Sequence, residues 1–163
     1  MTKMRGRILI FALLVVFGVI GTKAQTAPVG KTVEVKIYLF DTHGGYDSKK
    51  PNFLAVERTV AVGESVLRSA LEALLKGGTP EEASQSLHSP VSGIELVSVE
   101  MAGKTARLFF DRTEREPLTE FEKRLFTGSV SKTALQFSAV RAVEICLDGV
   151  IAAGSKTKPK KCG

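Results

Sequence analysis

The sequence predicts an α+β fold: a single-domain two-layer sandwich with helices on one face of a mixed sheet of about five strands. Apolar residues alternate with polar ones in five segments, as expected of half-buried strands, and recur at intervals of three and four in two others, as expected of helices. The expected order is strand-strand-helix-(helix)-strand-strand-helix-strand. Because this order mixes hairpins with helices, it is typical of helices packed on one side of a sheet.

The first two strands are expected at residues 32–40 and 53–61. In the first of them, the apolar positions fall on one face of the strand: Val33, Val35, Ile37 and Leu39. Residues 41–52, which join the two strands, are rich in turn-forming residues and are expected to be a loop.

Two helices are expected to follow. Apolar residues recur at helical spacing from Ser65 until the glycine pair at 77–78, where a helix C-terminus favours a left-handed residue. A shorter helix is expected to begin at Thr79, with proline in its first turn and Glu82 at the capping-box position, and to end near Leu87.

A tight hairpin is expected to join strands at residues 94–101 and 105–110. Helical spacing resumes over residues 118–137, although the glycine and serine at 128–129 could divide this helix in two. The last strand is expected at residues 140–147.

Residues 1–24 have the pattern of a signal peptide, with a basic start, an uninterrupted apolar or glycine run at 8–20, and small residues before a cleavage position after Ala24. A membrane-spanning helix needs roughly 20 apolar residues, and this run is shorter. Cleavage and export are therefore expected, and a membrane anchor formed by residues 8–21 is the alternative. No cysteine lies directly after the apolar run, where a lipid would be attached, so lipid attachment is not expected.

The remaining chain divides into a lead-in at residues 25–32, one domain at 33–151 and a basic tail at 152–163. The net charge of +6 arises at the two ends, which hold eight of the 23 Lys and Arg residues. The body between them is nearly neutral and the tail has no aromatic residue on which a base could stack, so nucleic acid is not an expected partner. The tail is expected to be a solvated end, with loose attraction to anionic wall polymer or lipid head groups as the alternative.

Cys146 and Cys162 are the only cysteines, and in an oxidising compartment such a pair is expected to form a disulfide. In the last strand, Ile145 and Leu147 point to one face and Cys146 to the other, where the tail could reach it. Closing this loop would stabilise the fold by about 3 kcal/mol. Two free thiols are the alternative.

No residue pattern predicts a catalytic centre, a metal site or a cofactor. Asp41, His43 and Asp47 lie close together in the sequence. Their spacing matches no standard metal site, and these residue types suit a glycine-rich turn. Turn chemistry is therefore the expected role of this group.

A possible interaction surface comprises Arg58, Phe109 and Phe110. Arg58 lies inside a strand, where its guanidinium needs a partner, and both pairing across the sheet with Glu34 and binding of a ligand carboxylate are open. Phe109 and Phe110 are adjacent in a strand and point to opposite faces. One of them can fill the core, and the other is either exposed to a partner or covered by a helix or the tail.

Five segments occur in the order and with the gaps of a known family. They are residues 35–40, 56–60, 70–82 (ALEALLKGGTPEE), 106–108 and 133–149 (TALQFSAVRAVEICLDG). In these segments the chain resembles the GerMN domain, named after the sporulation and spore germination protein GerM. The resemblance covers residues 33–150. Two positions depart from the family pattern, with Gly78 where proline is common and Phe109 where an acidic residue is common.

The resemblance implies an exported or membrane-anchored, non-catalytic module of bacterial envelope proteins connected with sporulation, germination or the cell wall. Such modules are similar to small α+β ring-building domains that pack against other proteins. The expected function is therefore a secreted binding module without a cofactor, whose partner is an envelope protein or a cell-wall polymer.

Two other functions remain open. One is a self-assembling structural domain that uses the same surfaces between identical copies. The other is a cell-wall hydrolase that depends on Asp111, Glu114 or Glu116. The hydrolase is less favoured, because these residues lie in a run of alternating charge that is typical of a solvated helix start.

Overall fold

The computed structural model describes residues 30–43, 50–63, 65–90, 92–113, 116–153 and 161–162. The predicted signal peptide and its cleavage position lie outside these residues, as do most of the lead-in and most of the basic tail. Within the part of the chain that is described, no helix is both long and apolar enough to cross a membrane.

Seven strands and three helices form within the described residues. β2 (Asn52–Ala61), β1 (Thr32–Asp41) and β3 (Leu87–His88) make one antiparallel sheet in that order. β4 (Ile94–Ala102), β5 (Thr105–Arg112), β6 (Ala142–Leu147) and β7 (Val150–Ala153) make a second sheet, in which β5 and β6 run parallel. The helices are α1 (Val66–Leu75), α2 (Pro80–Ser84) and α3 (Glu120–Leu135).

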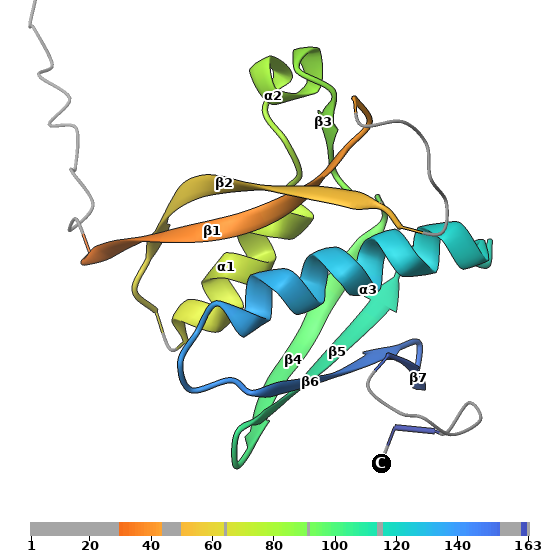
Figure 1. The fold of residues 1–163 in the computed structure, drawn as a ribbon. Coiled ribbons are helices and arrows are strands. Elements are labelled where there is room, and N and C mark those ends of the chain that lie inside the picture. Colours follow the sequence, from red (N-terminus) through yellow and green to blue (C-terminus); the bar gives the residue numbers. More distant parts are fainter. Residues whose placement is uncertain are drawn as a thin grey trace, which may run out of the picture.

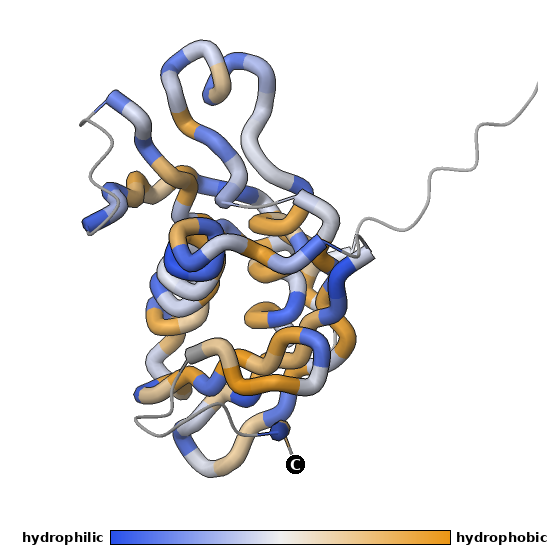
Figure 2. The backbone as a smooth tube through the Cα atoms, turned by 90° about the vertical axis from the view of Figure 1, so that its right-hand side faces the viewer, coloured by the Kyte–Doolittle hydropathy of each residue, from blue (hydrophilic) through white to orange (hydrophobic). Residues whose placement is uncertain are grey.

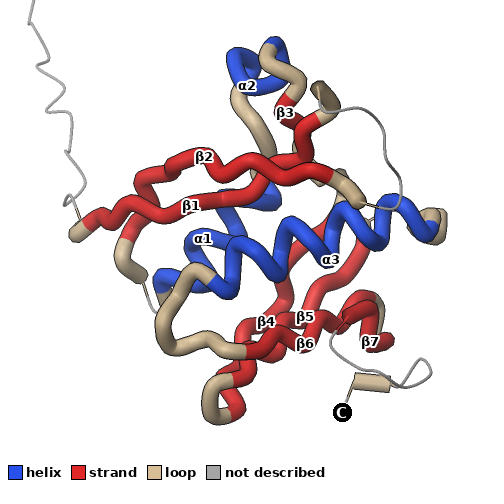
Figure 3. Tube along the Cα trace, in the orientation of Figure 1, coloured by secondary structure: helices blue, strands red, loops and turns tan. Residues whose placement is uncertain are grey.

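The helices α1 and α3 lie between the two sheets, so the molecule has three layers (Figures 1 and 3). Each of these helices contacts both sheets: α1 packs on β1, β2 and β4, and α3 packs on β1, β6 and β7. The α+β class is confirmed, but the expectation of one five-stranded sheet with helices on one face is wrong. Alternation marks a strand without saying which strands pair, and β3 and β7 are too short for alternation to predict.

One main core fills the space between the layers. Its fully buried side chains come from both sheets and from both long helices: Ile37, Leu39, Leu71, Leu74, Leu108, Phe110, Phe126, Val130 and Ile145. The rings of Phe110 and Phe126 meet edge to face with centroids 5.0 Å apart, which joins β5 to α3. Figure 2 shows that hydrophobic stretches are spread over the strands and the helices rather than confined to one element.

Each helix begins at a residue that caps its first turn. Ser65 accepts a hydrogen bond from a backbone N–H at the start of α1, and Thr79 and Thr119 form capping boxes with Glu82 and Glu122. The helix starts predicted at Ser65 and Thr79 are confirmed. The helix α2 ends earlier than expected, because the residues that follow it join β1 as β3.

The helix α3 runs unbroken through Gly128, although the sequence alone allowed the helix to be divided in two at this position. A Cβ atom at this position would lie 2.7 Å from Cζ of Phe53 on β2. The glycine therefore allows the helix to approach the strand closely and does not break the helix.

The helix α3 also covers the edge of β1 that β2 leaves free. The backbone N–H and C=O of Lys36 bond to the side-chain amide of Gln136 at 2.8 and 2.6 Å. Further along the strand, the N–H of Tyr38 donates to Thr133 Oγ1 at 3.3 Å, and the hydroxyl of Ser129 donates to the C=O of Tyr38. Polar side chains of a helix thus replace a neighbouring strand along this edge.

Candidate interaction surface

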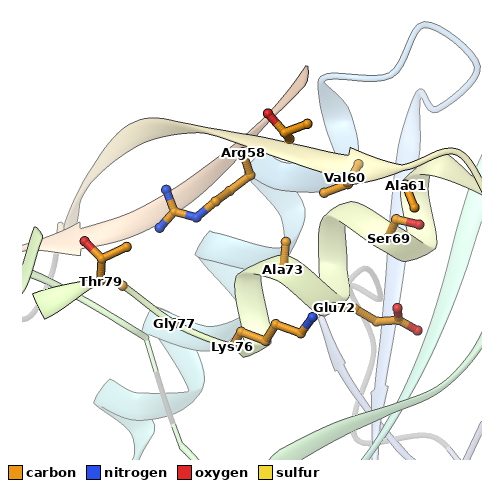
Figure 4. Close-up of a pocket in the computed structure, with 11 residues that line it drawn as sticks. Arg58, Val60, Ala61, Ser69, Glu72, Ala73, Lys76, Gly77 and Thr79 are labelled. Atoms are coloured by element: carbon orange, nitrogen blue, oxygen red, sulfur yellow. The ribbon is translucent and has the colours of Figure 1, made fainter. Parts of the chain in front are cut away.

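A surface groove of about 500 Å³ runs between β2 and α1 (Figure 4). Residues 58–61 of β2 form one wall, and the other is lined by residues on and just after α1: Ser69, Glu72, Ala73 and Lys76. The loop at 77–79 lines one end. Because Ser69 and Ala73 have small side chains, the space between strand and helix stays open.

At this end of the groove, Arg58 of β2 forms a bidentate ion pair with Glu82 of α2. The Nη1–Oε1 distance is 2.8 Å and the Nη2–Oε2 distance is 2.5 Å, and the two side chains are 21% and 16% exposed. These hydrogen bonds lower the pKa of Glu82 and raise the pKa of Arg58. Of the two partners left open for Arg58, Glu34 is excluded, because the strand register places Val35 opposite Arg58 and Thr59 opposite Glu34.

The two phenylalanines of the predicted interaction surface lie in different environments. Phe110 is 1% exposed and belongs to the core, so its inclusion in that surface is wrong. Phe109 points to the opposite face of β5 and is half-buried beside Ser98 of β4 and Cys146 of β6. Alternation along the strand separates the two rings and leaves only Phe109 partly accessible.

Cys146 and Cys162 lie at disulfide distance, with Sγ atoms 2.03 Å apart and Cα atoms 6.1 Å apart. The backbone N–H of Cys162 donates to the C=O of Gly149 at 3.0 Å, and Lys161 forms a bridge with Val150 of β7. Cys146 is 1% exposed although it lies on the face of β6 away from the core cluster. The described end of the tail is therefore held against β7.

Asp41 and His43 take part in a turn at the end of β1. One carboxylate oxygen of Asp41 accepts a hydrogen bond from the His43 N–H and the other from the Asn52 side chain, both at 2.8 Å. Asp47, the third residue of this group, lies outside the described residues. Across the residues that the structure does describe, no group of three or more His, Cys, Asp or Glu could hold a metal ion.

Of the acidic residues considered for hydrolysis, Asp111 lies in β5 and Glu116 lies between β5 and α3. Asp111 and Glu116 are exposed, and Glu114 is outside the described residues. In the same segment Arg112 pairs with Asp148, with 2.5 Å between Nε and Oδ2. This ion pair joins the end of β5 to the turn that follows β6.

Sequence reasoning did not find the helical wall of the groove. Ser69, Ala73 and Lys76 follow one another at helical spacing, as any partly exposed face of a helix would. Only the packing of α1 against β2 brings them to face an open strand. The sequence predicts Glu82 as a capping residue, but its second role as the partner of Arg58 depends on tertiary packing.

The fold and the groove define a small α+β module with an accessible site along a strand edge. The chain belongs to the sporulation and spore germination family, called Germane, whose family model matches residues 36–152. This match spans most of the described chain and confirms the resemblance to the GerMN domain. No curated protein sequence matches the chain.

Solved structures that are similar to the chain include two of GerM and one of a clostridial protein. The first GerMN domain of the sporulation protein GerM from Bacillus subtilis is 23% identical, with 72% of this chain and 84% of that chain covered and a TM-score of 0.47. The tandem GerMN domains of the same protein are 21% identical, with 73% of this chain and 40% of that chain covered and a TM-score of 0.48. A Clostridium perfringens protein described as a lipoprotein is 16% identical, with 82% of this chain and 89% of that chain covered and a TM-score of 0.44.

Proposed function

We propose that this protein is an exported binding module that acts outside the cytoplasm, without catalysing a reaction, by contacting an envelope protein or a cell-wall polymer. Its membership of the sporulation and spore germination family supports a role in spore formation, in germination or at the cell wall.

The observation that carries this proposal is the groove between β2 and α1. The edge of a strand, two small side chains and an exposed lysine line it. This combination suits an extended ligand better than an enclosed small molecule. Arg58 and Glu82 hold one end of the groove through two hydrogen bonds, so this end is ordered before a partner binds and the entropy cost of binding is smaller.

Two features support a location outside the cytoplasm. Residues 1–24 have the pattern of an export signal. Cys146 and Cys162 lie at disulfide distance, which suits an oxidising compartment. A membrane anchor formed by residues 8–21, present if the chain is not cut after Ala24, is compatible with the same role.

Photo-crosslinking in the native envelope tests the proposed function. A photoreactive residue replaces Lys76 in the groove, and a matched variant carries it at Lys104 in the turn between β4 and β5. Both lysines are exposed, so the two probes have similar access to solvent. Adducts are expected at position 76 and not at position 104.

Equal adducts at the two positions, or none at either, would contradict the binding role. Fractionation of the same cells checks the location. Recovery of the protein from the cytoplasm with residues 1–24 still attached would contradict export.

A further inference from the structure

We propose that β2 binds an extended peptide segment of a partner protein as an additional strand, and that this segment places an acidic side chain against Lys76. The inference rests on the proposed binding function and adds the chemistry of the partner. In such complexes, main-chain hydrogen bonds along the open strand provide affinity, and alternate side chains provide selectivity.

The outer edge of β2 presents the backbone groups of alternate residues. The N–H of Val62 donates to the C=O of Lys31 at 2.7 Å, so even-numbered residues of β2 bond to β1 and odd-numbered residues face outward. The contact between Arg58 Nη1 and the C=O of Glu57, at 3.0 Å, agrees with this direction. Among the described residues, the outward N–H and C=O of Thr59 have no hydrogen-bond partner.

The free edges of β1, β4 and β7 are each contacted by another part of the chain. On β1, the side chains of α3 occupy the edge, as described above. On β4, a bulge interrupts the ladder, and the guanidinium of Arg68 lies 3.4 and 3.5 Å from the C=O groups of Leu96 and Val97. On β7, Val150 is bridged to Lys161. A strand edge with free backbone groups favours pairing with another chain. On β2, the C=O groups of Glu57 and Ala61 accept hydrogen bonds from Arg58 and Gly63. As far as the chain is described, the N–H and C=O of Thr59, between them, stay free beside the groove.

The groove gives one face of an added strand an apolar floor. Val60 of β2 is 8% exposed, and Ser69 and Ala73 of α1 line the groove with it (Figure 4). Side chains alternate along a strand, so every second residue of the bound peptide would point into this space. The small side chains of α1 leave room there for a branched apolar residue.

Charge selects a second peptide residue that points into the groove, at an alternate position from the apolar one. Two ion pairs near the groove are already formed, Arg58 with Glu82 and Arg68 with Glu72. Lys76 lines the groove and is exposed, and within the described chain it has no ion-pair partner. Glu72 also lines the groove but is already paired with Arg68, so the positive charge of Lys76 favours an Asp or Glu side chain of the peptide.

A random peptide library displayed on phage tests this inference. It is panned against the protein purified from its envelope fraction, and the enriched peptides are synthesised and titrated against variants. Thr59→Pro removes an outward N–H that the pairing with β1 does not use, so β2 keeps its ladder. Lys76→Glu changes only an exposed side chain, which keeps the test valid if Thr59→Pro fails to fold. Lys104→Glu is the matched control for the charge change.

We expect the enriched peptides to carry Asp or Glu and a branched apolar residue at alternate positions. Binding should weaken about tenfold in Thr59→Pro and in Lys76→Glu, and by less than about twofold in Lys104→Glu. Hydrogen exchange of the Thr59 amide should slow when the peptide binds.

The inference is overturned if no peptide is enriched, if Lys76→Glu binds the peptides as well as the wild type does, or if the Thr59 amide is unaffected. Self-association that is lost in Thr59→Pro, measured by light scattering, would assign the edge to a second copy of this chain and overturn the peptide partner. In these cases, crosslinks from position 76 in the envelope would still support the proposed binding function. The absence of such crosslinks would contradict both the proposed function and the inference.

Discussion

Arg58 on β2 and Glu82 on α2 share two parallel hydrogen bonds, and the same carboxylate caps the helix that carries it. Glu82 Oε2 accepts from Arg58 Nη2 at 2.5 Å and from the backbone N–H of Thr79 at 2.8 Å. A single side chain therefore joins the start of α2 to the first sheet. It also positions the loop at 77–79, which lines the end of the groove.

Removing this ion pair should destabilise the fold by about 1 to 2 kcal/mol, because both side chains are mostly buried and their hydrogen bonds involve charged groups. A double-mutant cycle with Arg58→Ala and Glu82→Ala, measured by urea unfolding, should give a coupling free energy of about that size. The Arg68–Glu72 pair is the control, since its side chains are 37% and 47% exposed. Its coupling should be about 0.3 to 0.5 kcal/mol, and equal couplings in the two cycles would be inconsistent with this view.

Acid should weaken the fold through Glu82. Its pKa in the folded protein lies below the ordinary value because Arg58 donates hydrogen bonds to its carboxylate. A group whose pKa is lowered by folding contributes stability above its unfolded pKa, and this contribution is lost as the pH falls through the folded pKa.

Between about pH 6 and about pH 3, the wild type should therefore lose more of its free energy of unfolding than Glu82→Gln does. Urea unfolding across this range measures both losses. The pKa values of Glu81, Glu120 and Glu122 are also lowered, and their contributions are common to both proteins. Parallel pH profiles would show that Glu82 is not the group responsible.

Reduction should lower the free energy of unfolding by about 3 kcal/mol, because Cys146 and Cys162 are separated by 16 residues and a bridge of this span restricts the unfolded chain. Cys162→Ser should produce the same loss without reductant. Intact-mass spectra of the exported protein should change by two hydrogen atoms on reduction. A mass that stays constant would mean that the thiols are free.

Gly128→Ala should destabilise the wild type by about 1 kcal/mol. The added Cβ would lie 2.7 Å from Cζ of Phe53, and the strain of about 1 to 3 kcal/mol outweighs the gain of about 1 kcal/mol in helix propensity. In a Phe53→Ala background the overlap is gone, so the same substitution should stabilise. Thermal unfolding of the four proteins compares the two effects, and a stabilised single mutant would argue against close packing at this point.

Thr133→Val should cost about 1 to 3 kcal/mol, because the backbone N–H of Tyr38 would lose its acceptor on the buried helix face. The control is Thr127→Val, whose hydroxyl bonds only to the C=O of Lys123 in its own helix. Urea unfolding should show a smaller loss for the control. Similar losses would indicate that α3 does not support the edge of β1.

The local elements of this fold could be predicted, and their assembly could not. Alternation located β1, and the capping residues Ser65 and Thr79 located the helix starts, because these signals depend on neighbours in the chain. Gly128 was ambiguous, since a glycine in a helical pattern is consistent with a break or with close packing. The second sheet was missed as a separate layer because strand pairing joins segments that are distant in sequence.

The candidate site, too, could be predicted from the sequence only in part. Arg58 was recognisable as a charge that needed a partner, but the partner lies 24 residues away on another element. Phe109 and Phe110 were known to face opposite sides of a strand, but which side faces the core depends on where α3 packs. The signal peptide pattern and the family membership are properties of the sequence itself.

The sequence by itself determined the class of fold, the helix starts and the family, because spacing and capping act over a few residues. Tertiary structure alone decided that two sheets enclose α1 and α3, that Glu82 binds Arg58, and that β2 keeps an open edge beside Lys76. These outcomes depend on which apolar faces meet when the core forms. Many pairings of the same elements satisfy the local pattern, and burial of a shared core selects one of them.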